Sequence, residues 1–176
     1  MSGTLTLWSR AEAEEAAADR DLVCIVPTDY ELTIDLDDLN LTGSNSTLRL
    51  DVLESMTTVV RGEPLYVISQ SGEGLHVYVR LWVPFRVAER VALQAALGSD
   101  PIREMLSIQR LAIMIDETDL DSVVPVMLFE TPASAEAVAD WRARFPTEED
   151  NVEEWRAVML DAKPARGIRL REGVSE

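Results

Sequence analysis

Residues 31–37 most constrain how this chain can fold. From Leu32 onward the segment Glu-Leu-Thr-Ile-Asp-Leu-Asp alternates apolar and polar side chains, which is the period of a β-strand with one buried face. The two aspartates, Asp35 and Asp37, are two residues apart and therefore point to the same side of that strand. Their carboxylates would lie close enough to share a hard divalent cation. The alternative is an exposed strand edge whose acids are simply solvated.

A second strand pair follows about forty residues later. Residues 65–69 and 75–82 are apolar and β-branched, and a turn containing Gly72 and Gly74 joins them, which predicts a hairpin. His76, the only histidine, lies at the start of the second strand. It is a candidate site residue, although a lone histidine is also a common polar surface or core residue. The two glycines could expose backbone N–H groups to a phosphate or could only make the turn.

The remaining patterns indicate an α+β protein, with a mixed or antiparallel sheet and helices packed on one face. Gly98 is a natural helix C-cap, and Asp100 with Pro101 begins the next helix. The other expected helices are 9–19, 48–56, 87–97, 101–111, 131–145 and 151–160; the other expected strands are 22–26 and 125–130; residues 115–122 are expected to form a loop. We expect a core over residues 1–130 and a helical C-terminal extension over residues 131–176.

Composition limits the environment in which the protein works. The chain has 176 residues, enough for one domain with its own core, and 47% of them are hydrophobic. Cys24 is the only cysteine and lies in an apolar run, so we expect a small buried side chain in a reducing compartment. No stretch approaches the roughly 18 apolar residues of a membrane span. We therefore expect a cytoplasmic protein without a membrane partner.

The net charge of −16 argues against a general nucleic-acid binder, because phosphate backbones repel an acidic surface. The charge is uneven along the chain. Residues 60–112 carry 6 basic and 5 acidic groups, whereas residues 1–59 carry 3 and 12 and residues 113–176 carry 7 and 15. An anionic ligand should therefore meet the middle third of the sequence.

The order and spacing of these motifs resemble a known family. Asp35-Leu36-Asp37, followed by the Ser71-Gly72-Glu73-Gly74-Leu75-His76 turn, is similar to the first two motifs of archaeo-eukaryotic primases. The segments at 98–100, 110–111 and 125–130 are similar in arrangement to the primase-polymerases of phages and plasmids. The resemblance covers about residues 30–130 and implies an RRM-like primase core with metal-dependent nucleotidyl transfer in DNA replication.

The resemblance also implies roles for individual residues. Asp35 and Asp37 match the aspartates that hold Mg²⁺ or Mn²⁺, and His76 matches the histidine that contacts the phosphates of the incoming nucleotide. The other implied residues are Ser71 and Gly74 in the nucleotide-binding turn, Arg110 as a triphosphate or template contact, and Asp100 as third metal ligand, with Asp116 and then Glu104 as alternatives. Asp35, Asp37 and His76 would form the catalytic set.

Three departures keep a second function open. The segment after Arg110 lacks the Pro-Gly-Thr-x-Asn-like sequence of related primase-polymerases, the chain is acidic, and no helicase domain or zinc-binding cysteine set accompanies the core. An active enzyme would use nucleoside triphosphates and a single-stranded DNA template, with a helicase or other replication protein in trans. The alternatives are a degenerate core that has lost polymerase activity, and a non-catalytic acidic protein that mimics nucleic acid or binds a replication or defence protein. The sequence leaves the oligomeric state open.

Overall fold

The computed structural model describes residues 9–36, 52–56, 58–116 and 126–145, and the side chains of these residues apart from 113–116. The elements with defined bounds are α1 (Arg10–Ala18), β1 (Val23–Ile25), β2 (Glu31–Leu36), β3 (Leu65–Ile68), β4 (Leu75–Arg80), α3 (Val87–Leu97), α4 (Pro101–Asp116), β5 (Leu128–Glu130) and α5 (Pro132–Arg142). A short helical turn also covers residues 52–55. The protein is therefore of the α+β class, as the sequence predicts.

The predicted hairpin supplies the central strand and one edge strand of the larger sheet. This sheet is antiparallel, with strand order β2-β4-β3, so β4 lies between the other two strands. In the register of β2 against β4, Leu36 lies opposite Leu75 and Asp35 lies opposite His76. The alternating strand and the histidine-bearing strand are thus direct neighbours.

The remaining two strands make a separate sheet, which corrects the expectation of a single one. β1 pairs with β5 in antiparallel register, with Val23 opposite Glu130 and Ile25 opposite Leu128. Cys24 lies on β1 and is half-buried, with its Sγ 4.0 Å from the Sδ of Met127. This pairing joins segments more than 100 residues apart, which local sequence patterns do not reveal.

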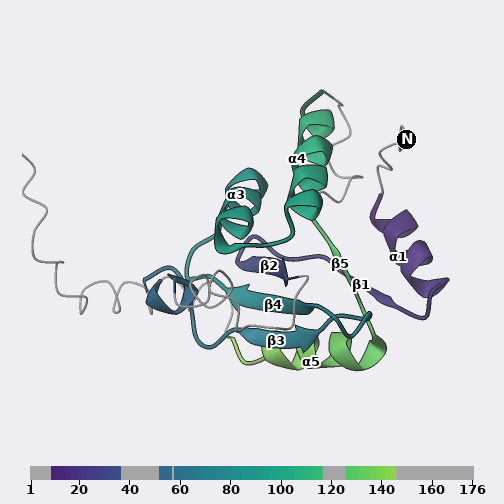
Figure 1. Ribbon diagram of the computed structural model, residues 1–176, viewed down its shortest axis with the longest axis horizontal. Helices are drawn as coiled ribbons and strands as arrows, with labels where there is room; N and C mark the ends of the chain where they lie inside the picture. The colour runs from purple at the N-terminus through teal and green to yellow at the C-terminus, as the bar shows by residue number, and fades with distance from the viewer. Residues whose placement is uncertain (1–8, 37–51, 57, 117–125, 146–176) are drawn as a thin grey trace, which may run out of the picture.

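Helices contact both faces of the larger sheet, which corrects the second part of the fold expectation (Figure 1). On one face, the leucine and valine side chains of β2 and β4 pack with Leu53 and with Leu97 of α3. On the opposite face, Tyr78 of β4 packs with Val138 and Trp141 of α5. The face that carries His76 and Tyr78 is therefore enclosed by α5 and the smaller sheet, and not left to solvent.

The outer edge of β2 is covered by the connection between α3 and α4. The N–H of Thr33 donates to Gln94 Oε1 (3.0 Å) and its carbonyl accepts from Arg103 Nη1 (2.6 Å). One pleat further along, the N–H of Asp35 donates to Ser99 Oγ (3.0 Å) and its carbonyl accepts from the Asp100 N–H (2.7 Å). Side chains and a helix start thus satisfy the backbone groups that an edge strand would otherwise present to another chain.

A buried ion cluster fixes α5 against the sheet. Glu31 is fully buried, and its carboxylate accepts from Arg142 Nη2 (2.6 Å) and Nε (3.0 Å), from Arg80 Nη1 (3.3 Å) and from the Thr28 N–H (3.1 Å). Both arginines keep their charge at any ordinary pH, so this carboxylate is compensated permanently. The cluster joins β2, β4 and α5.

Helix ends follow the capping residues of the sequence. Ser9 and Glu12 form a capping box at α1, Gly98 ends α3 with φ of 100°, and Thr131 caps α5. α4 continues to Asp116, so it is longer than predicted, and residues 115 and 116 are helical and not loop. The helix expected at 151–160 lies outside the described residues. Within the described part of the chain, no helix is long and apolar enough to cross a membrane.

Candidate functional site

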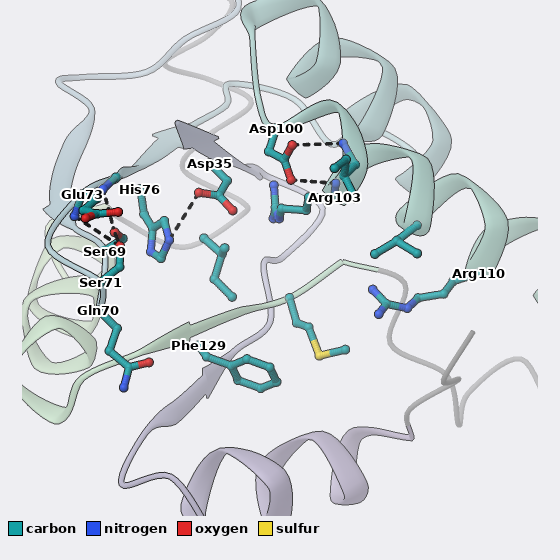
Figure 2. A pocket seen from close by; sticks show the side chains of 15 residues that line it. Asp35, Ser69, Gln70, Ser71, Glu73, His76, Asp100, Arg103, Arg110 and Phe129 are labelled. Atoms are coloured by element: carbon teal, nitrogen blue, oxygen red, sulfur yellow. Dashed lines mark hydrogen bonds and ion pairs between the residues drawn. The ribbon is translucent and has the colours of Figure 1, made fainter. Parts of the chain in front are cut away.

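Asp35 and His76 meet across the β2–β4 pair. They are directly opposite in the register, and Asp35 Oδ1 lies 3.5 Å from His76 Nε2 (Figure 2). Side chains of an opposed antiparallel pair lie on the same face of the sheet. The side chain of His76 is 8% exposed and that of Asp35 is 22% exposed, so the aspartate is the more accessible of the two. The family resemblance implied that Asp35 and His76 belong to one site, but it did not predict their direct pairing.

Glu130 completes the arrangement from the smaller sheet. Its Oε1 lies 2.7 Å from His76 Nδ1 and also accepts a short hydrogen bond from the Tyr78 hydroxyl. The Glu130 side chain is 1% exposed, and its Oε2 has no hydrogen-bond partner among the described residues. Burial and the adjacent Glu130 carboxylate, to which it also hydrogen-bonds, raise the pKa of the Tyr78 phenol, which keeps the hydroxyl protonated and able to donate.

A pocket of about 680 Å³ opens beside Asp35 and His76. Strand and turn residues form one side of it, and Ile102, Arg103, Leu106 and Arg110 of α4 form another. Met127, Leu128 and Phe129, at and just before β5, contribute a largely apolar wall. The pocket therefore combines acidic, basic and apolar surfaces within a volume that suits a small organic ligand.

The turn between β3 and β4 satisfies its own backbone groups. Ser69 Oγ accepts from the Gly74 N–H (3.0 Å), Ser71 Oγ accepts from the Glu73 N–H (3.2 Å), and the Gly72 N–H donates to the Ser69 carbonyl (2.9 Å). These three N–H groups are therefore engaged within the turn, which favours the hairpin explanation of the two glycines over a phosphate-binding loop. Ser71 and Gly74 nevertheless line the pocket, as the prediction of their role requires.

Gly74 is required by close approach and not by an unusual φ angle. A Cβ atom at this position would lie 2.7 Å from the carbonyl oxygen of Leu36 and 3.1 Å from Ser69 Oγ. Gly72, in contrast, has φ of 74° and open space around its missing Cβ. Gly74 thus lets the start of β4 lie close against the end of β2, next to the Asp35–His76 pair.

Asp100 lines the pocket and caps α4. Its Oδ1 accepts from the Ile102 N–H (3.0 Å) and its Oδ2 from the Arg103 N–H (2.9 Å), as the dashed lines in Figure 2 show. This is the N-cap role that the sequence also predicts. Both oxygens are already hydrogen-bonded, so the role of Asp100 as a metal ligand stays a prediction.

The other predicted acidic ligands are placed less favourably or are not described. Glu104 is 2% exposed and accepts from Ser99 Oγ (2.6 Å), Arg103 Nη1 (2.7 Å) and Gln94 Nε2 (3.1 Å). It therefore belongs to the buried network beneath the β2 edge. Asp37 lies outside the described residues, and so does the side chain of Asp116.

Arg110 supplies positive charge to the pocket from the third turn of α4. Its Nε is buried and has no hydrogen-bond partner among the described residues. Burial and the nearby Arg103 lower the pKa of Arg110. Arg103 is itself engaged by Thr33, Ser99 and Glu104. Arg110 is therefore the arginine of this pocket best placed to bind an anionic ligand (Figure 2).

The predicted site is thus brought together in part. Asp35, His76, Ser71, Gly74, Asp100 and Arg110 all line one pocket. Within the part of the chain that the structure describes, no three acidic, histidine or cysteine side chains form a group that could hold a metal ion. Sequence analysis missed Glu130, whose signal is an acid at the end of the apolar run Val126–Phe129.

Comparison with known proteins yields no relative: no family model, no curated protein and no solved structure matches this chain.

Proposed function

We propose that this protein is a metal-dependent nucleotidyltransferase of the primase-polymerase kind, with its nucleotide site in the pocket between Asp35, His76 and Arg110. The observation that carries the proposal is the direct opposition of Asp35 and His76 on β2 and β4, at a pocket that Arg110 also lines. Under this proposal the larger sheet and its helices are an RRM-like primase core, and the chain from residue 131 onward is an extension of it.

The polar groups of the pocket suit a metal-bound triphosphate: the carboxylates would bind the cations, and His76 and Arg110 would bind the phosphates. Asp35 offers hard carboxylate oxygens, the donor type that Mg²⁺ and Mn²⁺ prefer, with Asp37 and Asp100 as the proposed further ligands. When bound, the cations would lower the pKa of the attacking 3′-hydroxyl and neutralise the leaving pyrophosphate.

The residues of the chain would then orient the phosphates. His76 Nε2 faces the pocket, and a ring protonated on both nitrogens would donate from Nδ1 to Glu130 and from Nε2 to a phosphate oxygen. Arg110 would compensate the negative charge from α4. Met127 and Phe129 would contact the sugar or base. In this arrangement the histidine binds and positions the substrate and does not act as a general base.

Calorimetry tests this function directly. Wild-type protein should bind ATP or dATP in the presence of Mn²⁺, and the Asp35→Ala/Asp37→Ala variant should lose at least tenfold in affinity. Glu136→Ala/Asp140→Ala is the matched control, because both are exposed acids on α5 and their removal changes the net charge by the same amount. Absence of binding by the wild type, or equal binding by the double variant, would contradict the proposal. Extension of a primed single-stranded DNA template would then separate an active enzyme from a degenerate one.

A second candidate function rests on the net charge of −16. A protein of this charge could bind the basic surface of a replication or defence protein as a nucleic-acid mimic, with an affinity that falls as salt rises. This function predicts that Asp35→Ala leaves the affinity for a purified basic DNA-binding protein unchanged. It also predicts no dependence on Mn²⁺.

A further inference from the structure

Three glutamates are fully or nearly fully buried in the described part of the chain, and one of them differs from the others. Glu31 contacts Arg80 and Arg142, and Glu104 contacts Arg103. Among the described residues, no arginine or lysine lies within ion-pair distance of Glu130, whose hydrogen-bonding neighbours are His76 and Tyr78. A buried carboxylate needs hydrogen-bond donors to offset the loss of water, so these two side chains must both donate to it.

We infer that Glu130 is a positioning residue that holds the His76 ring with its Nδ1–H directed inward and its Nε2 directed at the pocket. The inference rests on the proposed function only for its consequence in nucleotide binding; the ring orientation itself is a property of the free protein. It assigns to the C-terminal residue of β5 a role that the sequence motifs do not reveal.

The geometry supports this orientation from both sides of the ring. Nδ1 lies 2.7 Å from Glu130 Oε1, a distance typical of a strong hydrogen bond to a carboxylate. Nε2 lies on the opposite edge of the ring, 3.5 Å from Asp35 Oδ1, which is longer than a normal hydrogen bond. The inner nitrogen is thus firmly held, whereas the outer nitrogen has room for a ligand.

Tyr78 fixes the direction of the inner hydrogen bond. Its hydroxyl donates to the same oxygen, Glu130 Oε1, so that oxygen acts as an acceptor. Burial and the Glu130 charge raise the pKa of the Tyr78 phenol, which therefore stays a donor. With the carboxylate accepting, the proton of the His76–Glu130 bond resides on Nδ1. Hydrogen bonds of this kind fix the tautomer and orientation of functional histidines.

The sole histidine of the chain makes the test unambiguous, because its ring signals need no sequence assignment. In full-length protein labelled with ¹⁵N-histidine, at one fixed pH, we expect Nδ1 to carry a downfield, slowly exchanging proton. Glu130→Met should abolish that proton signal, and Glu130→Gln should weaken it. Tyr78→Phe should preserve it, and so should the matched control Glu31→Gln, which alters a different buried glutamate.

The wild-type spectrum alone can overturn the inference. A neutral ring with its proton on Nε2 would contradict it, even if the Glu130 variants failed to fold, and so would an unchanged Nδ1 signal in folded Glu130→Met. If the inference holds, Glu130→Gln should also weaken the binding of Mn²⁺-ATP by roughly 10–100-fold, as loss of an orienting partner does. Normal ring signals together with no ATP binding by the wild type would refute the proposed function and leave the role of Glu130 intact.

Discussion

Glu31 and Glu130 are both fully buried and both contact β4, yet their surroundings differ in kind. Glu31 receives four hydrogen bonds, three of them from the guanidinium groups of Arg80 and Arg142. Glu130 receives bonds from a histidine and a tyrosine on one oxygen only. The first carboxylate is compensated by permanent charges and joins α5 to the sheet. The second accepts hydrogen bonds from a phenol and an imidazole, neither of which carries a fixed positive charge. The imidazole also lines a pocket, and buried acids with such partners are typical of functional sites.

The largest expected effect is on the Glu31 cluster. Glu31→Gln leaves two arginines without their buried counter-charge, and loss of one partner from a buried ion cluster typically destabilises by about 3–5 kcal/mol. Urea unfolding followed by circular dichroism would measure this free energy. Glu130→Gln should lower this free energy less, by about 1–3 kcal/mol, because a carboxamide oxygen in the place of Oε1 can still accept both bonds, although more weakly than a carboxylate. An equal loss of unfolding free energy in the two variants would contradict the distinction between the Glu31 cluster and the surroundings of Glu130.

A second variant tests the close packing beside the pocket. Gly74→Ala should lower the free energy of unfolding by about 1–3 kcal/mol, because the new Cβ would meet the backbone carbonyl of Leu36 and the strand must shift. Gly72→Ala is the matched control in the same turn. Its added Cβ meets nothing, so the expected loss is only about 1 kcal/mol, from its positive φ. A Gly74→Ala variant as stable as wild type would show that the β2–β4 contact tolerates displacement.

The stability that Tyr78 contributes near Glu130 should depend on pH. Its pKa is raised in the folded protein, whereas an unfolded tyrosine ionises near about pH 10. Above that pH the unfolded chain loses a proton that the native state retains, so the stability contributed by the neutral phenol is present below pH 10 and is lost as pH rises further.

Tyr78→Phe should therefore be less stable at neutral pH by about 1 kcal/mol and should show a shallower decline in alkali. Unfolding curves recorded between pH 8 and pH 11 would measure both effects. Tyr66→Phe is the comparison, because Tyr66 is an exposed residue of β3 and its pKa is raised mainly by partial burial. An identical alkaline decline in wild type and Tyr78→Phe would contradict the assignment.

The smallest effect on stability is expected at the pocket arginine. The buried Nε of Arg110 has no hydrogen-bond partner among the described residues, so Arg110→Gln breaks no bond at that atom and should change the free energy of unfolding by no more than about 0.5 kcal/mol. The same change should weaken Mn²⁺-ATP binding, measured by calorimetry. Arg142→Gln should do the reverse, with a large loss of stability and unchanged binding, because Arg142 serves the Glu31 cluster. A large destabilisation in Arg110→Gln would place Arg110 with the structural arginines.

Local patterns predicted most of the helices and strands and, at the site, Asp35 and His76 but not Glu130. The alternation of residues 31–37 and the glycine-bearing turn before His76 predicted β2 and the β3–β4 hairpin, and capping residues predicted the helix starts. The register of β2 against β4, which sets Asp35 directly opposite His76, was not derivable, because register depends on packing between distant segments. For the same reason the sequence did not predict the separate β1–β5 sheet.

Glu130 shows this limit most clearly. It reaches His76 across 54 positions of sequence, from a strand that belongs to the other sheet. Its pattern, an acid after four apolar residues, is equally typical of a strand that ends at the surface. The same holds for Glu104, whose burial depends on Gln94 and Ser99. Buried acids can be recognised only when the donors that compensate them are known.

The attachment of the start of α4 to Asp35 also fixes the spacing between two ends of the pocket. The N–H of Asp100, the residue that caps α4, donates to the carbonyl of Asp35, and Arg110 lies ten positions further along the chain, in the third turn of the helix. At 1.5 Å per residue, the helix sets these two positions roughly 15 Å apart along its axis. A ligand that contacts both the Asp35 end of the pocket and Arg110 would have to span this distance, less the reach of the arginine side chain.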